Sequence, residues 1–452
     1  MKKESVCLIS LGCPKNQVDS EVMLGLLVKR GYTISPNPAQ ADIILINTCS
    51  FITEATQEAL ETVLEAVDLK RVGSCRRVVV TGCLAQRYGA ELAGELPEVD
   101  LFLGTDQFPR IVDFLESSLD QDRRVYTGRT SFLYDHTVPR ILSGPSYHAY
   151  IKIAEGCSRS CSFCIVPSLR GSFRSRPIAS IHEEARLLAA QGVKEIDLVA
   201  QDTTAYGEDL RDGTTLAGLL ESLCSLEGLA WIRLLYAFPD RIDSALLSRI
   251  LESDKICKYI DLPLQHVSDG ILRAMGRPGS RRSLEALIAR IREEIPGVCL
   301  RTTLMVGFPG ETEADFSELA DWVEKTRFER LGVFQFSPEE GTRAATMKGQ
   351  VSEPVKRRRF ENLMELQQRI SLEHNRSLVG KTVPVLVEGR LGDSGILRGR
   401  MATQAPEIDG QVLITRGTAS PGEILEVRIT KALPYDLEGE IPSGNDPGGR
   451  LA

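Results

Sequence analysis

Short apolar runs alternate with amphipathic stretches along the first quarter of the chain. The apolar runs lie at 5–10, 42–47, 77–81 and 101–104, and the helical stretches at 20–30, 54–69 and 85–96. Continuous Val/Ile/Leu runs indicate strands buried on both faces, and their alternation with helices predicts a parallel sheet. We therefore expect an α/β domain over residues 4–125, followed by a linker over 120–146 that lacks this periodicity.

The same alternation resumes in the middle of the chain with more units. Six strands are expected at 149–154, 195–200, 231–237, 258–262, 299–306 and 331–336. One helix is expected to open at the capping box Ser180–Glu183 and another to span 280–294. Six β/α units are fewer than the eight that close a TIM-type barrel. We expect an open, partial (β/α)6 barrel within residues 140–372.

The last quarter changes character after a long helix expected at 352–372. That helix carries the basic run Lys356–Arg359, which is most often a solvated helix face and less often a nucleic-acid contact. Short β runs at 382–387, 395–401, 411–415 and 423–430 then predict a small antiparallel β-barrel within 375–440. Residues 443–452 are expected to form a frayed tail.

Composition narrows the class of protein. The 452 residues are 42% hydrophobic and 26% charged, with a net charge of −8, which excludes a wholly disordered chain. No apolar run approaches the ~18 residues of a membrane span, and an acidic chain attracts a basic protein more readily than a polyanion. The eleven cysteines come without an export signal. We expect a cytoplasmic protein whose reduced thiols serve metal binding or catalysis.

Three cysteines lie within eight residues, at Cys157, Cys161 and Cys164, directly after the first expected barrel strand. Three thiolates on a short loop can hold a cubic iron–sulfur cluster and leave the fourth iron open to a substrate or cofactor. A zinc site is the alternative, but it normally needs a fourth Cys or His at short range. The spacing therefore favours a cluster with one open iron at the carboxyl end of barrel strands.

A second group is dispersed in sequence. Cys13, Cys49 and Cys83 each follow a different expected strand of the N-terminal sheet. Carboxyl ends of parallel strands meet at one edge, so these three thiols are expected to converge and to hold a second cluster with an open iron. The remaining cysteines are interpreted as buried or surface thiols without a metal role: Cys7, Cys75, Cys224, Cys257 and Cys299.

The Cys157–Cys164 spacing, with Phe163 before the last cysteine, resembles the radical S-adenosylmethionine (SAM) superfamily, and the whole chain resembles its methylthiotransferases. Their protein-modifying branch is most similar, through Leu-Gly-Cys-Pro-Lys-Asn at 11–16, Asp202 and the segments 261–266, 301–303 and 404–410. Cys7 and Gln17 depart from the family pattern. The resemblance implies an N-terminal cluster domain, a radical SAM barrel and a C-terminal TRAM barrel.

The resemblance also implies an activity. The protein-modifying branch adds a methylthio group to the β-carbon of an aspartate in small-subunit ribosomal protein twelve. It uses two [4Fe-4S] clusters, one SAM as methyl donor and another as radical source, and a low-potential electron donor such as flavodoxin or ferredoxin. Candidate SAM contacts are Phe163, Gln201, Asp202 and Gly307, and no catalytic residue is expected beyond the six cluster cysteines. Arg170, Arg174 and Arg176 are weaker candidates, with surface exposure equally expected.

Two other functions stay open. A tRNA (adenosine) methylthiotransferase is favoured by the basic run and by the usual RNA association of TRAM barrels. The expected barrel lacks an aromatic stacking platform, which RNA recognition commonly uses. A non-enzymatic iron–sulfur redox or sensing protein would need neither an open iron nor a partial barrel, and SAM-dependent deoxyadenosine formation discriminates against it.

Overall fold

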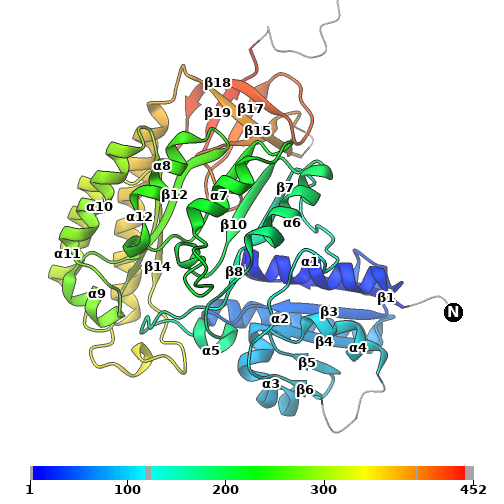
Figure 1. Ribbon diagram of the computed structural model, residues 1–452. Helices are drawn as coiled ribbons and strands as arrows, with labels where there is room; N and C mark the ends of the chain where they lie inside the picture. Colours follow the sequence, from blue (N-terminus) through cyan, green and yellow to red (C-terminus); the bar gives the residue numbers. More distant parts are fainter. Residues whose placement is uncertain (1–3, 118–123, 393, 443–452) are drawn as a thin grey trace, which may run out of the picture.

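The computed structural model describes residues 4–117, 124–392 and 394–442. It contains an N-terminal parallel α/β sheet, a second and larger parallel sheet, and a closed C-terminal barrel. The N-terminal part lies against one end of the larger sheet and the C-terminal barrel against the other (Figure 1). None of the helices in the described ranges combines the length and hydropathy of a membrane span.

The N-terminal sheet has the strand order β2-β1-β3-β4-β5-β6, and every neighbouring pair is parallel. Its strands are β1 (Ser5–Ser10), β2 (Thr33–Ile34), β3 (Ile43–Thr48), β4 (Arg77–Gly82), β5 (Leu101–Leu103) and β6 (Val125–Tyr126). Its helices are α1 (Pro14–Lys29), α2 (Thr53–Val72), α3 (Cys83–Glu95) and α4 (Ile111–Glu116). The central strand β3 is buried along its whole length, as its unbroken apolar run predicts.

Two features of this sheet differ from the sequence prediction. Helix α1 begins at Pro14, six residues before its expected start, and α3 begins at Cys83, two residues before its expected start. The first turn of α1 is polar and so carries no hydrophobic pattern, and its Asn16 bonds to Leu11 O and Thr48 O. Strand β6 lies within the stretch expected to be a linker, and it pairs with β5 at the sheet edge.

The second sheet is the expected partial barrel of six parallel strands, in the order β14-β13-β12-β11-β10-β7. They are β7 (His148–Lys152), β10 (Glu195–Val199), β11 (Trp231–Leu234), β12 (Ile256–Gln265), β13 (Cys299–Val306) and β14 (Arg330–Gln335). A short antiparallel pair, β8 (Ala154–Glu155) and β9 (Arg174–Ser175), follows β7.

Helices cover the outer face of this sheet (Figure 1). They are α6 (Ile178–Ala190), α7 (Leu216–Cys224), α8 (Ser244–Glu252), α10 (Arg281–Glu294), α11 (Glu313–Thr326) and α12 (Glu353–Arg376). Two shorter helices, α5 (Val166–Arg170) and α9 (Asp269–Met275), complete this part of the chain. The expected start of α6 at Ser180 is wrong. The helix begins at Ile178 after Pro177, and the Ser180 hydroxyl accepts a hydrogen bond from Arg176 instead of capping the helix.

The C-terminal barrel has five strands in the closed order β15-β16-β17-β19-β18. They are β15 (Thr382–Arg390), β16 (Leu397–Met401), β17 (Val412–Arg416), β18 (Ile424–Ala432) and β19 (Leu437–Glu440). Its ladders are antiparallel except for β17 with β19, which is parallel. Strand β19 was not expected from sequence, since only two of its four residues are buried. The expected tail at 443–452 lies outside the described residues.

This barrel packs against the amino-terminal ends of the larger sheet's strands. Glu195, the first residue of β10, pairs with Arg233 at 2.8 Å and with Arg400 of the C-terminal barrel at 2.6 Å. The Tyr259 hydroxyl donates to Asp409 at 2.7 Å. Glu195, Arg233, Tyr259 and Arg400 are buried, and the side chain of Asp409 is only 3% exposed, so the two parts form one continuous packed unit.

Candidate functional site

The N-terminal cysteines lie at one edge of the first sheet. Cys49 directly follows β3, Cys83 directly follows β4 as the first residue of α3, and Cys13 stands between β1 and α1. Strands β1, β3 and β4 are neighbours and parallel. The structure therefore places all three residues at the carboxyl ends of adjacent strands, which the sequence order of strands and cysteines had predicted.

Close backbone packing holds this edge together. Gly12 has φ of +91°, and a Cβ on it would lie 2.5 Å from Cys49 Cβ and 3.1 Å from its Sγ. Only glycine permits both the conformation and the approach. The Asn16 amide nitrogen donates to Leu11 O and to Thr48 O, which ties the Cys13 loop to the end of β3.

Neighbouring charges act on these thiols. Burial, together with the negative charge of Cys83 and Cys13 when they are ionised, raises the pKa of Cys49 to about 12. Burial also raises the pKa of Cys83. For Cys13, burial is outweighed by Lys15 and Arg170, which lower its pKa. The three thiols would repel one another as thiolates. Two nearby cations and a positively charged inorganic core, which the thiolates would ligate, would both reduce this repulsion.

The second cysteine group lies on the loop after β8. Gly171 O accepts a hydrogen bond from Cys157 N, and Ser162 is anchored to α9 through Met275 O and Ala274 O. Burial, together with the charges of Cys161 and Cys157, raises the pKa of Cys164 to about 12. These three residues are thus within electrostatic range of one another, as are the N-terminal three.

The donor chemistry fits a multi-iron cluster at each group. Within the described ranges, no three residues among Cys, His, Asp and Glu are close enough to hold a single metal ion. A cubane differs from zinc in that each thiolate binds a separate iron, so its ligands are spread more widely. Three thiols at each group would leave one iron of such a cluster without a protein ligand, and this stays a prediction.

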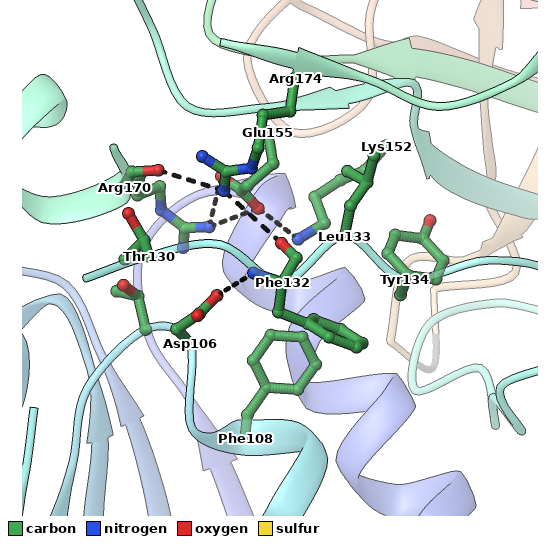
Figure 2. Close-up of a pocket in the computed structure, with 11 residues that line it drawn as sticks. Asp106, Phe108, Thr130, Phe132, Leu133, Tyr134, Lys152, Glu155, Arg170 and Arg174 are labelled. Atoms are coloured by element: carbon green, nitrogen blue, oxygen red, sulfur yellow. Dashed lines mark hydrogen bonds and ion pairs between the residues drawn. The ribbon is translucent and has the colours of Figure 1, made fainter. Parts of the chain in front are cut away.

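A buried ionic network joins the two cysteine groups. Arg170, at the end of α5, is only 4% exposed and lies 3.2 Å from Asp19 of α1 and 3.1 Å from Glu155 of β8. Lys152 contacts the same two carboxylates, Glu155 at 2.6 Å. Figure 2 shows Lys152 and Arg170 converging on Glu155. Burial of four charges is tolerable only because each has a partner.

Two cavities differ in what they can accept. The cleft in Figure 2, beside Phe108 and Phe132, has a volume of about 10 Å³, room for a water molecule at most. A cavity of about 230 Å³ lies beside Cys157 and is also lined by Phe173, Asp202 and Arg241. The larger cavity is therefore the one that offers space for a cofactor next to the second cysteine group.

Two of the four residues predicted to contact SAM lie near this region. The Gln201 amide nitrogen donates to Glu155 at 3.2 Å, whereas its buried carbonyl oxygen has no partner in the described chain and can accept from a ligand. Asp202 lines the larger cavity, but its carboxylate already pairs with Arg159 at 2.9 Å and Arg241 at 3.2 Å.

The other two candidates pack mainly against the protein itself. Phe163 is partly buried in an apolar cluster that includes Met275 and Phe308. A Cβ on Gly307 would lie 2.3 Å from the Lys356 side chain, so this glycine is required by α12 packing. Their roles as cofactor contacts stay predictions.

Several arginines are less exposed than expected. Arg170 and Arg176 are buried, and Arg176 pairs with Glu184 at 2.6 Å rather than facing solvent. In the basic run, Lys356 and Arg359 are buried, and Arg359 lies 3.3 Å from Glu311. Two of the four residues in the run are therefore buried and paired with glutamates. This removes the main feature that favoured an RNA contact.

Sequence reasoning missed two pairs of side chains near the cysteines. Arg277, from the loop after α9, lies 4.0 Å from Cys161 Sγ and stacks on Phe238 at 3.6 Å. Lys15 lies over the ring of Tyr236, 3.8 Å from its centroid. The residues of each pair are far apart in sequence, and no local motif connects them. Lys15 alone had a signal, because it follows Cys13 in the motif at 11–16.

Family models match all three parts of the chain. Residues 5–104 match the family described as Uncharacterized protein family UPF0004, residues 151–323 the Radical SAM superfamily, and residues 379–441 the TRAM domain. Membership in the radical SAM superfamily implies SAM and a [4Fe-4S] cluster as cofactors.

Curated relatives extend over nearly the entire chain. The ribosomal protein uS12 methylthiotransferase RimO of Geotalea uraniireducens is 54% identical over 441 residues, covering 97% of this chain and 98% of its own. RimO of Geobacter sulfurreducens is 53% identical, covering 98% and 99%.

A solved structure agrees with the fold. The radical SAM methyltransferase TsrM from Kitasatospora setae superimposes with a TM-score of 0.55 at 15% identity, covering 75% of this chain and 74% of its own. At that identity the likeness concerns the fold alone. By its near-complete similarity to the curated relatives, the chain belongs to the RimO family of radical SAM methylthiotransferases.

Proposed function

We propose that this protein adds a methylthio group to the β-carbon of an aspartate in ribosomal protein uS12. One SAM serves as methyl donor and another as radical source. The observation that carries the proposal is identity above 50% with uS12 methylthiotransferases over nearly the full length of both chains. A ribosomal substrate places the activity in the cytoplasm, and a low-potential donor such as flavodoxin or ferredoxin would supply electrons.

The chemistry explains why such cofactors are needed. The β-carbon of aspartate carries C–H bonds that no side-chain base of ordinary pKa can deprotonate, so the hydrogen must leave with one electron. When bound, the clusters supply the electron that cleaves SAM and the sulfur that is inserted. The protein's own task is to hold the reactants in register and to exclude water.

We assign the six cysteines accordingly. Cys157, Cys161 and Cys164, in the radical SAM domain at 140–372, would hold the cluster that cleaves SAM. Cys13, Cys49 and Cys83, in the N-terminal domain at 4–125, would hold the second cluster. The TRAM domain at 375–440 would complete the molecule. These cysteine assignments are supported by the position of each group after the carboxyl ends of strands, where its three thiols interact electrostatically.

Other side chains would tune and orient the bound groups. Arg277 places a cation beside Cys161 and so stabilises thiolate charge there. The free carbonyl oxygen of Gln201 would accept a hydrogen bond from SAM. The pairing of Asp202 with Arg159 and Arg241 would fix one wall of the adjoining cavity.

The most direct test measures the product in cells. In a strain that lacks this gene, mass spectrometry should show that uS12 has lost the methylthio mass while tRNA is unchanged. Complementation with the intact gene should restore it. Loss of the methylthio group only from tRNA would refute the proposal in favour of a tRNA methylthiotransferase.

Cysteine variants separate the two sites. Replacing Cys161 with Ala should abolish deoxyadenosine formation by the reconstituted protein, because one cluster ligand is lost. Replacing Cys49 with Ala should leave deoxyadenosine formation but end methylthio transfer to uS12. The buried Cys257, far from either group in the fold, provides a matched Cys→Ala control. Normal product from the Cys49 variant would contradict the second assignment.

A further inference from the structure

Lys15 is a buried cation without an acidic partner. The residue is only 9% exposed and stands in the first turn of α1, two positions after Cys13. Within the described part of the chain, its ammonium makes no hydrogen bond or ion pair that would balance its charge. Nearby Lys152 and Arg170 are each balanced by both Asp19 and Glu155. Burial lowers the pKa of Lys15, but Tyr236 and a Cys13 thiolate outweigh burial and favour the charged form. No acceptor in the described chain takes a hydrogen bond from the ammonium, so the oxygens of a ligand can complete the site.

The surface beneath this ammonium is held in an unusual conformation. The Tyr236 ring lies 3.8 Å below the Lys15 nitrogen, and Tyr236 itself has φ of +60°. A bulky residue adopts this conformation only when its surroundings impose it. Here Asp261 accepts from Tyr236 N at 2.9 Å and Thr203 N donates to Tyr236 O at 3.1 Å. The ring is thus fixed where it orients the ammonium.

The position of Lys15 lies between the two cysteine groups. Its helix starts at Pro14, directly after Cys13, and its aromatic partner Tyr236 follows the carboxyl end of β11 in the barrel. Lys15 is also within electrostatic range of Glu155 and Arg170, which border the Cys157 loop. Lys15 is therefore placed beside the first cysteine group and next to residues that border the second.

We propose that Lys15 binds the side-chain carboxylate of the substrate aspartate. This inference rests on the proposed function. The β-carbon of aspartate is bonded directly to that carboxylate. A cation that holds the carboxylate therefore also positions the reacting carbon next to it. An adenine base, the target in the tRNA alternative, is uncharged and would not compensate the ammonium. The carboxylate of SAM shares the same chemistry and is separated from the substrate by the experiment.

The test compares uS12 with a uS12 variant whose target aspartate is replaced by asparagine. Affinity for the iron-loaded protein is measured with both forms, in the presence of SAM. The unmodified enzyme should bind the aspartate form about tenfold to a hundredfold more tightly, as expected for a hydrogen-bonded charge. In Lys15→Met this preference should vanish. Lys29→Met, exposed at the far end of the same helix, should retain it.

Further measurements keep the outcome interpretable. Iron content and thermal unfolding establish that Lys15→Met is folded and loaded, and Lys15→Gln replaces it if it is not. A variant that keeps the full preference for aspartate overturns the assignment of Lys15, even where uS12 is modified normally. A loss of SAM affinity with the preference intact assigns Lys15 to SAM and likewise overturns the inference. An enzyme that does not modify uS12 at all overturns the proposed function itself.

Discussion

At Gly12, the backbone passes directly beside Cys49 with a positive φ. Substitution with Ala would strain the backbone and drive the new Cβ against the Cys49 side chain at 2.5 Å. We expect Gly12→Ala to destabilise the protein by about 1–3 kcal/mol. We also expect it to lower the iron bound after anaerobic reconstitution, since Cys49 must move. Urea unfolding and iron analysis measure the two effects.

Gly94→Ala is the matched control. Gly94 lies in α3, has no positive φ, and a Cβ there would meet no atom within 4 Å. The substitution should be neutral or stabilise by up to ~1 kcal/mol, with iron content unchanged. If Gly12→Ala behaved in the same way, the close approach to Cys49 would have no part in shaping the site.

The cysteines illustrate what can be predicted at the scale of single residues. Cys157, Cys161 and Cys164 are marked by their spacing, and Cys13, Cys49 and Cys83 by their position after strands. Arg277 and Tyr236 carry no such mark, because each reaches the site from a separate element and depends on tertiary packing. The same reason explains why Arg170, expected at the surface as readily as in a site, is buried.

Among the elements, α1 joins the N-terminal sheet to the barrel through Asp19. This carboxylate contacts both Lys152 and Arg170. We expect Asp19→Ala to reduce the free energy of unfolding by about 3–5 kcal/mol, since it leaves two buried cations with only Glu155 between them. Urea denaturation of the intact protein measures this loss.

An exposed ion pair at the opposite end of the same helix provides the comparison. Arg30 pairs with Glu116 at 2.6 Å, but its side chain is 58% exposed. Arg30→Ala should change stability by less than ~1 kcal/mol. Equal effects of the two substitutions would show that the Asp19 network does not contribute to holding the parts together.

Element prediction succeeded where burial was continuous. The apolar runs of β1 and β13 match the observed strands at both ends, and α10 begins after its expected Ser280 cap. It failed where a polar side chain makes a tertiary contact instead of a local one. At Ser180, the hydroxyl accepts a hydrogen bond from Arg176 and does not cap the helix. Short edge strands such as β6 also escaped, because two residues carry no periodicity.

On the scale of the whole molecule, Glu195 connects the partial barrel with the TRAM barrel. Burial opposes its ionisation, but Arg233 and Arg400 outweigh burial and hold the pKa of Glu195 well below its usual value. A lowered pKa contributes stability above the unfolded-state pKa of about 4.3, and this stability is lost as pH falls. We expect Glu195→Gln to cost about 3–5 kcal/mol at pH 7, and the difference from the unmodified protein to shrink from about pH 5 downward.

Thermal unfolding between pH 7 and pH 4 tests this dependence. Glu438→Gln removes one side of a pair with Lys431, which is 60% exposed, and should have little effect at any pH in this range. A constant difference between the Glu195 variant and the unmodified protein at all pH values would contradict the role of its charge.

The network of Asp19, Lys152, Glu155 and Arg170 has a consequence for turnover. These charges cannot separate without entering apolar surroundings unpaired, so the N-terminal sheet and the barrel keep one mutual orientation through every cycle. We therefore expect the spacing between the two cysteine groups to be set by this network, because it ties α1 of the N-terminal sheet to the loop region after β8.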